Sequence, residues 1–242
     1  MKKLHAIVIL TSSVISTSLH ADTVSERLSA AFEATNPDIT VQSVEDSVVP
    51  NMKQVQLSNG EYLYATNDSR YMFSGRLIEL SGTEFTDLTE EKMRLDRVET
   101  LHNIDLSKSI TFQASGEEKY EVFVFTDVSC GYCKNFHTHI GEIVQEGITV
   151  HYLAFPRAGV ASPVGELMGR VWCSEDQQAA LTEVKAQNSL SQTPVPCKAP
   201  VSEQYALAQK LGVRGTPAIF DEDGNSLGGY LTTEQLVTAL NR

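Results

Sequence analysis

The sequence is poor in basic residues and in long apolar runs. Of 242 residues, 19 are Lys or Arg and 31 are Asp or Glu, which gives a formal net charge of −12 at pH 7. So acidic a surface argues against a nucleic acid as partner, because phosphate backbones attract basic proteins. Beyond the N-terminus, no stretch is long and apolar enough to span a bilayer. The composition therefore predicts a protein without nucleic-acid binding or stable membrane insertion.

Residues 1–21 have the pattern of a secretory signal peptide. Lys2 and Lys3 precede an apolar core over residues 4–15, and a polar stretch follows up to Ala21, the predicted cleavage point. The apolar core is short and interrupted by polar residues, which disfavours the alternative of a membrane anchor. Cleavage removes two lysines and changes the formal charge to −14. We therefore expect an exported mature chain.

Cysteine is also scarce, with four residues in the chain. Export implies an oxidising compartment, in which four cysteines can form two disulfides. Cys130 and Cys133 form a local Cys-x-x-Cys pair, which leaves Cys173 and Cys197 to each other. A structural disulfide between the latter two would contribute roughly 3 to 4 kcal/mol in the chain-entropy model. The alternative of a second redox pair is disfavoured, because neither residue begins a helix after a strand.

The Cys-x-x-Cys sequence lies between a predicted strand over 120–127 and a predicted helix over 130–146. A cysteine at the start of a helix faces unpaired backbone N–H groups and the positive end of the helix dipole, which both favour the thiolate. Cys130 is therefore the predicted nucleophile. Cys133, one turn later on the same face, is placed to attack the sulfur of Cys130 and release what is attached to it. The setting after a strand favours a redox site over a metal site.

Neighbouring residues were weighed as metal ligands or as modifiers of the cysteines. His137 and His139 follow the cysteines at a spacing that suggests zinc, but two residues apart they point to different sides of a helix, so we expect no metal. Lys134 stands where a c-type haem motif requires histidine, and no cofactor is expected. Gly131 and Tyr132 are either passive spacers or residues that tune the redox properties of the site, and we favour tuning.

Residues 22–82 predict a small N-terminal domain with one helix and a few strands. An Asn-Gly dipeptide at 59–60 predicts a hairpin with a type I′ turn, in which both central residues have positive φ. The predicted elements are a helix that ends at Asn36-Pro37 and strands at 54–57, 62–64 and 71–80. So thin a core is marginal for independent stability, which suggests that a second copy of the domain completes it.

Residues 83–107 are interpreted as a linker helix. Over 85–103 the chain is rich in charge and has a narrow apolar stripe. A solvated surface helix within one domain is the alternative, but the composition changes on either side, which favours a connection to a C-terminal domain over 108–242.

The C-terminal domain is predicted to be of the α/β class. A strand, a crossover helix and a parallel strand form a right-handed unit, which places Cys130 beyond the carboxyl end of its strand. The expected strands lie at 110–112, 120–127, 149–155, 218–220 and 226–227, and the expected helices at 130–146, 202–211 and 232–241, with a polar helical insertion over 162–199.

Three segments carry a resemblance to known proteins: Cys-Gly-Tyr-Cys at 130–133 after Phe-Thr-Asp, Val-His-Tyr-Leu-Ala-Phe-Pro-Arg at 150–157, and Gly-Val-Arg-Gly-Thr-Pro-Ala at 212–218. Together they resemble the thioredoxin fold and, over nearly the whole chain, the DsbC/DsbG family of periplasmic thiol:disulfide interchange proteins. The resemblance implies a thioredoxin-like catalytic domain with a helical insertion, preceded by a small α+β, cystatin-like dimerisation domain and a linker helix. It also implies a V-shaped homodimer.

The same resemblance implies roles for further residues. Pro217 corresponds to a cis-proline beside the active-site cysteines, and the backbone of Thr216 would pair with an extended substrate strand, a mode of binding that tolerates many sequences. Thioredoxin has a buried carboxylate six residues before its first cysteine, where this chain has Val124. The group that deprotonates Cys133 is therefore unassigned.

The function implied is that of a periplasmic protein disulfide isomerase and reductase. It would act on misfolded exported proteins, be kept reduced by the membrane reductase DsbD, and be shielded from the oxidant DsbB by dimerisation. The alternatives are a DsbG-like reductase that protects single cysteines and a holdase chaperone with incidental redox activity. The sequence leaves the substrates, the reduction potential and the predominant redox state open.

Overall fold

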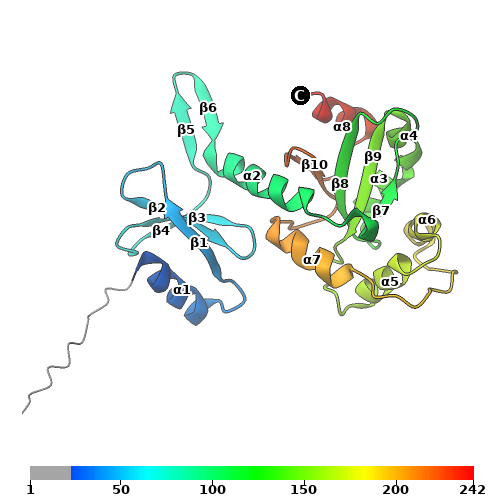
Figure 1. Ribbon diagram of the computed structural model, residues 1–242, viewed down its shortest axis with the longest axis horizontal. Coiled ribbons are helices and arrows are strands. Elements are labelled where there is room, and N and C mark those ends of the chain that lie inside the picture. Colours follow the sequence, from blue (N-terminus) through cyan, green and yellow to red (C-terminus); the bar gives the residue numbers. More distant parts are fainter. Residues whose placement is uncertain (1–22) are drawn as a thin grey trace, which may run out of the picture.

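The computed structural model describes residues 23–242 and shows two regions connected by a long helix (Figure 1). The predicted signal peptide lies outside the described residues. The N-terminal region consists of α1 (Val24–Thr35), β1 (Val41–Asp46), β2 (Met52–Leu57), β3 (Tyr62–Thr66), β4 (Met72–Ser74), β5 (Ile78–Ser81) and β6 (Glu84–Asp87). The first four strands form one antiparallel sheet in the order β1-β2-β3-β4, and β5 and β6 form a separate hairpin.

Helix α1 begins and ends where local sequence signals predict. Thr23 caps it in a reciprocal arrangement with Glu26, and the backbone N–H of Asn36 closes its C-terminus. Its buried residue, Leu28, packs against the four-stranded sheet. The buried apolar cluster around α1 is small: Leu28, Val55, Leu57, Leu63 and Ala65. Tyr62 and Tyr64 of β3 are also buried, and their hydroxyls bond to Asp96 and Thr89 of the long connecting helix.

The hairpin between β2 and β3 exists as predicted, but its turn differs from the predicted type. Only Gly60 has positive φ, at 76°, so the turn is not of type I′. The amide of Leu57 donates to the carbonyl of Glu61, which closes a longer loop. A Cβ on Gly60 would lie 2.3 Å from the carbonyl oxygen of Lys210. The loop therefore approaches the C-terminal region closely, and only glycine fits there.

Two predicted boundaries after this hairpin were wrong. The strand expected over 71–80 is divided into β4 and β5, which belong to different sheets, and Gly75 at φ 147° lies between them. Phe85 pairs with Leu80 in the β5–β6 hairpin rather than starting a helix. The connecting helix α2 (Leu88–His102) begins later, because the side chain of Asp87 accepts a hydrogen bond from the amide of Glu90 and caps it.

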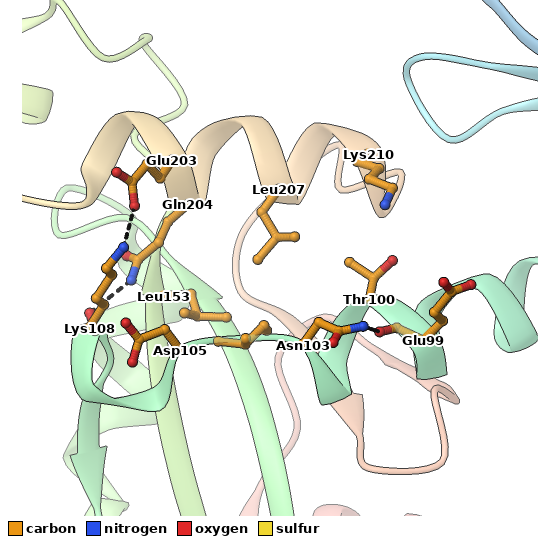
Figure 2. Close-up of a pocket in the computed structure, with 11 residues that line it drawn as sticks. Glu99, Thr100, Asn103, Asp105, Lys108, Leu153, Glu203, Gln204, Leu207 and Lys210 are labelled. Atoms are coloured by element: carbon orange, nitrogen blue, oxygen red, sulfur yellow. Dashed lines mark hydrogen bonds and ion pairs between the residues drawn. The ribbon is translucent and has the colours of Figure 1, made fainter.

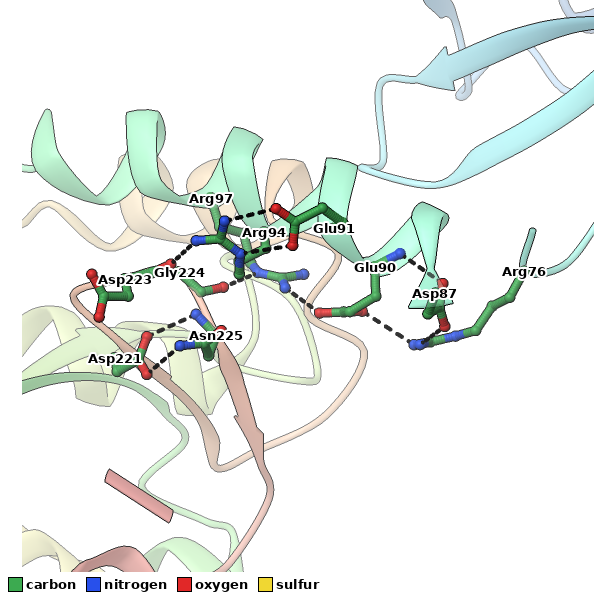
Figure 3. Close-up of polar contacts among 10 residues, drawn as sticks. All are labelled: Arg76, Asp87, Glu90, Glu91, Arg94, Arg97, Asp221, Asp223, Gly224 and Asn225. Carbon is green, nitrogen blue, oxygen red and sulfur yellow. Dashed lines mark hydrogen bonds and ion pairs between the residues drawn. The ribbon is translucent and has the colours of Figure 1, made fainter. Parts of the chain in front are cut away.

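Two arginines fasten α2 to the C-terminal region (Figure 3). Arg97 is 3% exposed, donates to the carbonyl of Gly224 at 2.6 Å, and is also paired with Glu90. Arg94 donates to the carbonyl of Asp223 at 2.9 Å. Helix α2 is therefore docked against the C-terminal region along much of its length and is not a freely solvated helix.

The C-terminal region is built on a five-stranded sheet in the order β11-β10-β8-β9-β7, in which β8 and β9 are parallel and the other pairs antiparallel. Its strands are β7 (Ile110–Phe112), β8 (Tyr120–Thr126), β9 (Ile148–Ala154), β10 (Ala218–Asp221) and β11 (Ser226–Gly228). Its helices are the short 3₁₀ segment Leu106–Lys108, α3 (Gly131–Thr138), α4 (Ile140–Gln145), α5 (Pro163–Trp172), α6 (Gln177–Gln187), α7 (Val201–Lys210) and α8 (Thr233–Leu240). The single helix predicted over 130–146 is thus two helices, separated at His139.

Strand alternation divides the core of this region into two layers. Val122 and Val124 face one side of the sheet, where α3 to α6 and α8 cover them, and Phe123 and Phe125 face the other, covered by α7 and the end of α2. Both faces of the sheet are therefore buried.

The predicted helical insertion consists of α5 and α6, and it contains the disulfide between Cys173 and Cys197. Trp172 next to the disulfide is 2% exposed, belongs to the core on the α3 side of the sheet, and donates its ring N–H to the carbonyl of Lys108 at 3.1 Å. The insertion is thus continuous with the domain core. Among residues 23–242, no helix has the length and apolar character needed to cross a membrane.

Candidate active site

Cys130 and Cys133 lie together at the carboxyl end of β8, where the sequence placed them. Cys130 is the N-cap residue of α3 and Cys133 lies in its first turn. Both are free thiols, and their residues are 2% and 1% exposed. The amide of Cys130 donates to the carbonyl of Asp127 at 3.1 Å, which closes the tight turn from strand to helix.

The two thiols have opposite pKa shifts. Burial raises the pKa of the Cys130 thiol, but hydrogen bonding from Thr216 and from the backbone of Cys133 and the charge of Arg157 outweigh it, so the net pKa is lowered. For Cys133 burial dominates and its pKa is raised, although the positive charge of Lys185 acts in the opposite direction. The thiolate therefore forms preferentially at Cys130.

A cis peptide bond joins Thr216 and Pro217 and lies directly against Cys130. The thiol of Cys130 donates to the carbonyl of Thr216 at 3.2 Å. The Thr216 side chain is buried beside the cysteines and acts to lower the pKa of both. A chain segment 86 residues away thus borders Cys130.

Buried Asp127 and half-exposed Arg157 support the turn that precedes Cys130. The carboxylate of Asp127, which is 1% exposed, accepts from the amide and hydroxyl of Ser129, both at 2.7 Å, and from the amide and Nε of Arg157 at 2.9 and 3.0 Å. Burial raises the pKa of Asp127, but these hydrogen bonds outweigh it and the net pKa is lowered. Sequence reasoning quoted both residues within motifs but assigned neither a role.

Gly131 and Tyr132, the residues between the cysteines, are exposed. The Tyr132 side chain is 65% exposed, and its ring centre lies 6.1 Å from that of Tyr230. A Cβ on Gly131 would meet no atom within 4 Å, so the space around this position is open. Both residues can contact whatever approaches Cys130.

The two predicted histidines, His137 in α3 and His139 between α3 and α4, have different surroundings. His137 is buried, and its ring nitrogens bond to the Tyr152 hydroxyl at 3.0 Å and to the Thr182 hydroxyl at 2.9 Å. Burial lowers the pKa of His137 to about 3, so this ring is neutral at physiological pH. His139 instead pairs with Glu142. Within residues 23–242, no group of three or more potential ligand side chains is arranged to hold a metal ion.

Sequence reasoning missed one buried group, Lys185 of α6. Lys185 is 3% exposed, donates to the Thr126 hydroxyl at 2.8 Å, and lies 5.5 Å from the ring centre of Tyr152. A weak signal was present in the sequence, because Leu181 lies four residues earlier on the same helix face. A lysine at such a position usually extends to solvent, which is why it passed unnoticed.

A separate pocket of about 360 Å³ lies between the end of α2 and α7, on the opposite face of the sheet from Lys185 (Figure 2). Its lining includes Thr100, Leu153 and Leu207, while Lys108 and Glu203 pair at 2.8 Å along its border. None of the residues predicted to act in catalysis or substrate binding lines it, so we do not assign it to the chemistry of the cysteines.

Comparison with known proteins identifies both regions of the chain. Residues 108–242 match the model of a thioredoxin-like domain, and residues 18–90 match that of a disulfide bond isomerase N-terminal domain. The chain is 34% identical over 209 residues to the thiol:disulfide interchange protein DsbC of Escherichia coli K12, covering 86% of this chain and 85% of that protein. It is 36% identical to the DsbC of Pasteurella multocida, covering 81% and 83%.

A solved structure supports the fold of the C-terminal region. The disulfide interchange protein of Neisseria gonorrhoeae superposes with a TM-score of 0.50 at 26% sequence identity. That alignment covers 57% of this chain and 96% of the other. The shared part corresponds in extent to a thioredoxin-like domain. The N-terminal region is identified by the family model that matches residues 18–90.

Proposed function

The chain belongs to the DsbC family of thiol:disulfide interchange proteins, and on this premise we propose that it is a periplasmic protein disulfide isomerase and reductase. Its substrates are misfolded exported proteins with non-native disulfides. The observation that carries the proposal is the free Cys130 thiol, whose pKa is lowered and which lies between the helix start and the Thr216 carbonyl. Cys130 is the nucleophile.

The reaction is thiol–disulfide exchange. The Cys130 thiolate attacks one sulfur of a substrate disulfide, a bond forms between the two sulfurs, and the other substrate sulfur leaves as a thiolate. That thiolate can attack a further substrate disulfide and finally displace Cys130, which rearranges the disulfides without net oxidation. If rearrangement stalls, Cys133 attacks Cys130 and releases a reduced substrate, and the enzyme becomes oxidised.

Substrate binding uses the backbone of Thr216 and the cis-proline Pro217. An extended substrate strand pairs with this backbone, so that recognition depends little on substrate side chains. Gly131 and Tyr132 tune the site, because they are exposed beside the nucleophile. The disulfide between Cys173 and Cys197 is structural, and its place in the α5–α6 insertion supports this role.

The enzyme works as a homodimer through its N-terminal domain. We take residues 22–82 as this domain, 83–107 as the linker and 108–242 as the catalytic domain. Strands β4 to β6 and their flanks carry large apolar side chains that are at least 42% exposed: Tyr71, Met72, Phe73, Ile78, Leu80 and Phe85. Such a surface matches the need of a thin domain for a second copy. A membrane reductase such as DsbD returns the oxidised enzyme to the dithiol form.

Serine variants of the two cysteines, each incubated with a scrambled substrate, test this function. Cys133→Ser should accumulate a covalent complex with a scrambled multi-disulfide substrate, because the resolving thiol is missing, whereas Cys130→Ser should form none and rescue nothing. Mass spectrometry and recovery of native substrate give the two readouts. A Cys130→Ser protein that still rescues scrambled substrate would leave only the holdase alternative, and rescue of single oxidised cysteines alone would indicate the DsbG-like reductase.

A further inference from the structure

Lys185 is a buried cation beside the cysteines to which no step above gives a role. It lies on α6 at 3% exposure, and its polar partner is the neutral hydroxyl of Thr126 rather than a carboxylate. An ammonium group removed from water with only a hydroxyl as partner is unfavourable. A buried ionisable group of this kind next to a reactive pair is a candidate for function.

The groups that face Lys185 come from α3, the turn after β8, and β9. Burial lowers its pKa to about 8, and the negative charge of nearby groups acts in the opposite direction. The facing groups are Cys133, Cys130 and Asp127, which raise its pKa, Lys134, which lowers it, and the neutral Tyr152 and His137. The amine is therefore within reach of deprotonation near neutral pH, as buried lysine bases are.

The Thr126 side chain connects the lysine to Cys133. Thr126 ends β8, is fully buried, and accepts from Nζ of Lys185 at 2.8 Å. Hydrogen bonding by the Thr126 side chain also acts to lower the pKa of Cys133. A hydroxyl can accept one hydrogen bond while it donates another. The Thr126 hydroxyl is therefore hydrogen-bonded to the Lys185 amine and also acts on the Cys133 thiol, which makes it the link between the two groups.

We propose that Lys185 accepts the proton of Cys133 through the Thr126 hydroxyl when Cys133 resolves a mixed disulfide. The inference rests on the proposed function and names the base for its second step. The Cys133 proton passes to the Thr126 oxygen while the hydroxyl proton passes to Lys185. The Cys133 thiolate attacks the Cys130 sulfur, the bond from Cys130 to the substrate breaks, and the substrate thiolate takes a proton from water. The cysteine pair loses two electrons and the substrate gains them.

The proton transfer from Cys133 to Lys185 depends on the charge state of Cys130. In the mixed disulfide Cys130 carries no negative charge, so one of the groups that raise the pKa of Lys185 is lost. The neutral amine of Lys185 therefore forms more readily in the mixed disulfide than in the enzyme with a Cys130 thiolate, and the mixed disulfide is the state in which Cys133 must lose its proton. After the transfer, the ammonium and the thiolate face each other in a poorly solvated interior, where opposite charges attract strongly.

A lysine base differs from the carboxylate of thioredoxin in its effect on the thiolate. A carboxylate becomes neutral when it accepts the proton, whereas lysine becomes positive and then stabilises the anion it has created. Val124 leaves the usual position of the carboxylate empty of ionisable groups. Lys185 reaches Cys133 instead from α6, on the same face of the sheet as Val124.

The two steps can be separated with the aromatic disulfide DTNB. One coloured thiolate is released when Cys130 attacks it, and a second when Cys133 resolves the mixed disulfide. Lys185→Met keeps the length of the side chain but removes the amine, and we expect the second release to slow about tenfold at pH 7, since one pKa unit is a factor of ten in thiolate. Its pH profile should move to higher pH, while the first release changes less than about twofold.

Thr126→Val removes the hydroxyl at nearly constant shape and should slow the second release in the same way. Lys134→Met is the matched control, because it removes a positive charge beside Cys133 that lies outside the path, and its second release should stay within about twofold of the wild type. Melting temperatures show whether each variant is folded. If Lys185→Met does not fold, the rate of the second release in Thr126→Val tests the proposal instead.

The outcomes separate the two proposals. Absence of the first release in the wild type would reject the proposed function itself. A normal first release followed by an unchanged second release in Lys185→Met, or in Thr126→Val where that variant decides, would overturn the role of Lys185. Equal slowing in Lys134→Met would also overturn it, because any nearby positive charge would then suffice.

Discussion

The N-terminal and C-terminal regions differ most in how they bury apolar surface. The C-terminal sheet is covered on both faces, by α3 to α6 and α8 on one side and by α7 and the end of α2 on the other. The cluster between α1 and the N-terminal sheet has only five buried residues, and Tyr62 and Tyr64 of β3 are also buried. Strands β4 to β6 of that region expose large apolar side chains, and in Figure 1 the β5–β6 hairpin projects away from the rest. The C-terminal region thus buries both faces of its sheet, whereas the N-terminal region leaves apolar side chains exposed on the surface that we propose a second copy covers.

The two regions also differ in where their ionisable groups lie. The C-terminal region buries Asp127, His137 and Lys185 around the cysteines, and each has a shifted pKa. The N-terminal ion pairs, such as Arg76 with Asp87, are partly exposed and contribute little to stability. Redox chemistry therefore belongs in the densely packed region, where desolvation shifts pKa values, and association belongs in the thin one.

The largest expected effect comes from placing charge on the exposed N-terminal strands. Leu80→Asp with Phe85→Asp should dissociate the homodimer, since each apolar side chain contributes about 2 kcal/mol when buried, and about 4 kcal/mol is roughly a thousandfold in dissociation constant. Recovery of scrambled substrates should fall at least about tenfold, because two facing catalytic domains raise the effective concentration of substrate. The first DTNB release should stay unchanged. Sedimentation velocity measures the dimer.

Val48→Asp is the control for this variant. Val48 is 75% exposed in the same region but lies outside β4 to β6. It should remain dimeric and active. A monomeric wild-type protein, or a dissociated variant with full isomerase activity, would contradict the assignment of association to the N-terminal strands.

Acid should destabilise the C-terminal region before the N-terminal one. Burial lowers the pKa of His137 in the folded protein to about 3, against an ordinary value of 6.5. Between these two values the unfolded state binds more protons, so stability rises with pH and is lost on acidification, by about 1.4 kcal/mol per pH unit or about 2 kcal/mol from pH 6.5 to 5. Urea unfolding monitored by Trp172, the chain's one tryptophan, reports on this region alone.

His137→Gln should flatten that dependence on pH, and His139→Gln, at a side chain that is 40% exposed, is the matched surface control. His151 also has a pKa lowered by burial, and it accounts for a residual slope of the same sign. An equally steep loss of stability in the His137→Gln protein would show that its neutral ring is not the source of the acid sensitivity.

The smallest expected effect tests the contact that joins the two regions. Gly224 has φ 76°, and a Cβ there would lie 2.5 Å from the carbonyl of Arg94 in α2. Gly228 has φ 97° with no atom within 4 Å of a Cβ, so Gly228→Ala measures the backbone strain alone. Gly224→Ala should cost about 1 kcal/mol more than this control, which corresponds to a melting temperature lower by about 2 to 4 °C. Equal melting temperatures of Gly224→Ala and Gly228→Ala would mean that α2 moves to accommodate the methyl group without loss of stability.

Much of the fold could be predicted because its signals are local. The alternation of Val122 to Phe125, the helical spacing at the start of the N-terminal region, and the strand before Cys130 all depend on residues a few positions apart. The errors lie where distant contacts decide. The turn at Gly60 packs closely against the backbone of Lys210. The expected strand over 71–80 is divided because β5 pairs with β6 rather than with the first sheet.

The candidate site shows the same division. Cys130, Cys133 and their order along α3 were predictable, because the start of a helix follows from the sequence around it. Thr216 and Pro217 were assigned through a resemblance, and the structure places them beside Cys130 across 86 residues of chain. Arg157 was quoted within a motif but given no role, and Lys185 was missed, since a lysine is usually solvated and nothing in its immediate sequence states that it is buried.

The sequence by itself determined where the Cys-x-x-Cys pair lies, that its first cysteine stands at the start of a helix, and that a small α+β region precedes an α/β region. Those properties follow from local backbone geometry and from composition. Only the tertiary structure decided which groups surround the cysteines, because desolvation and charge act through space. Lys185 is hydrogen-bonded to Thr126, 59 residues away in the sequence, and Arg97 to Gly224, 127 residues away. The proton path to Cys133 and the docking of α2 exist only once the sheet has brought these segments together.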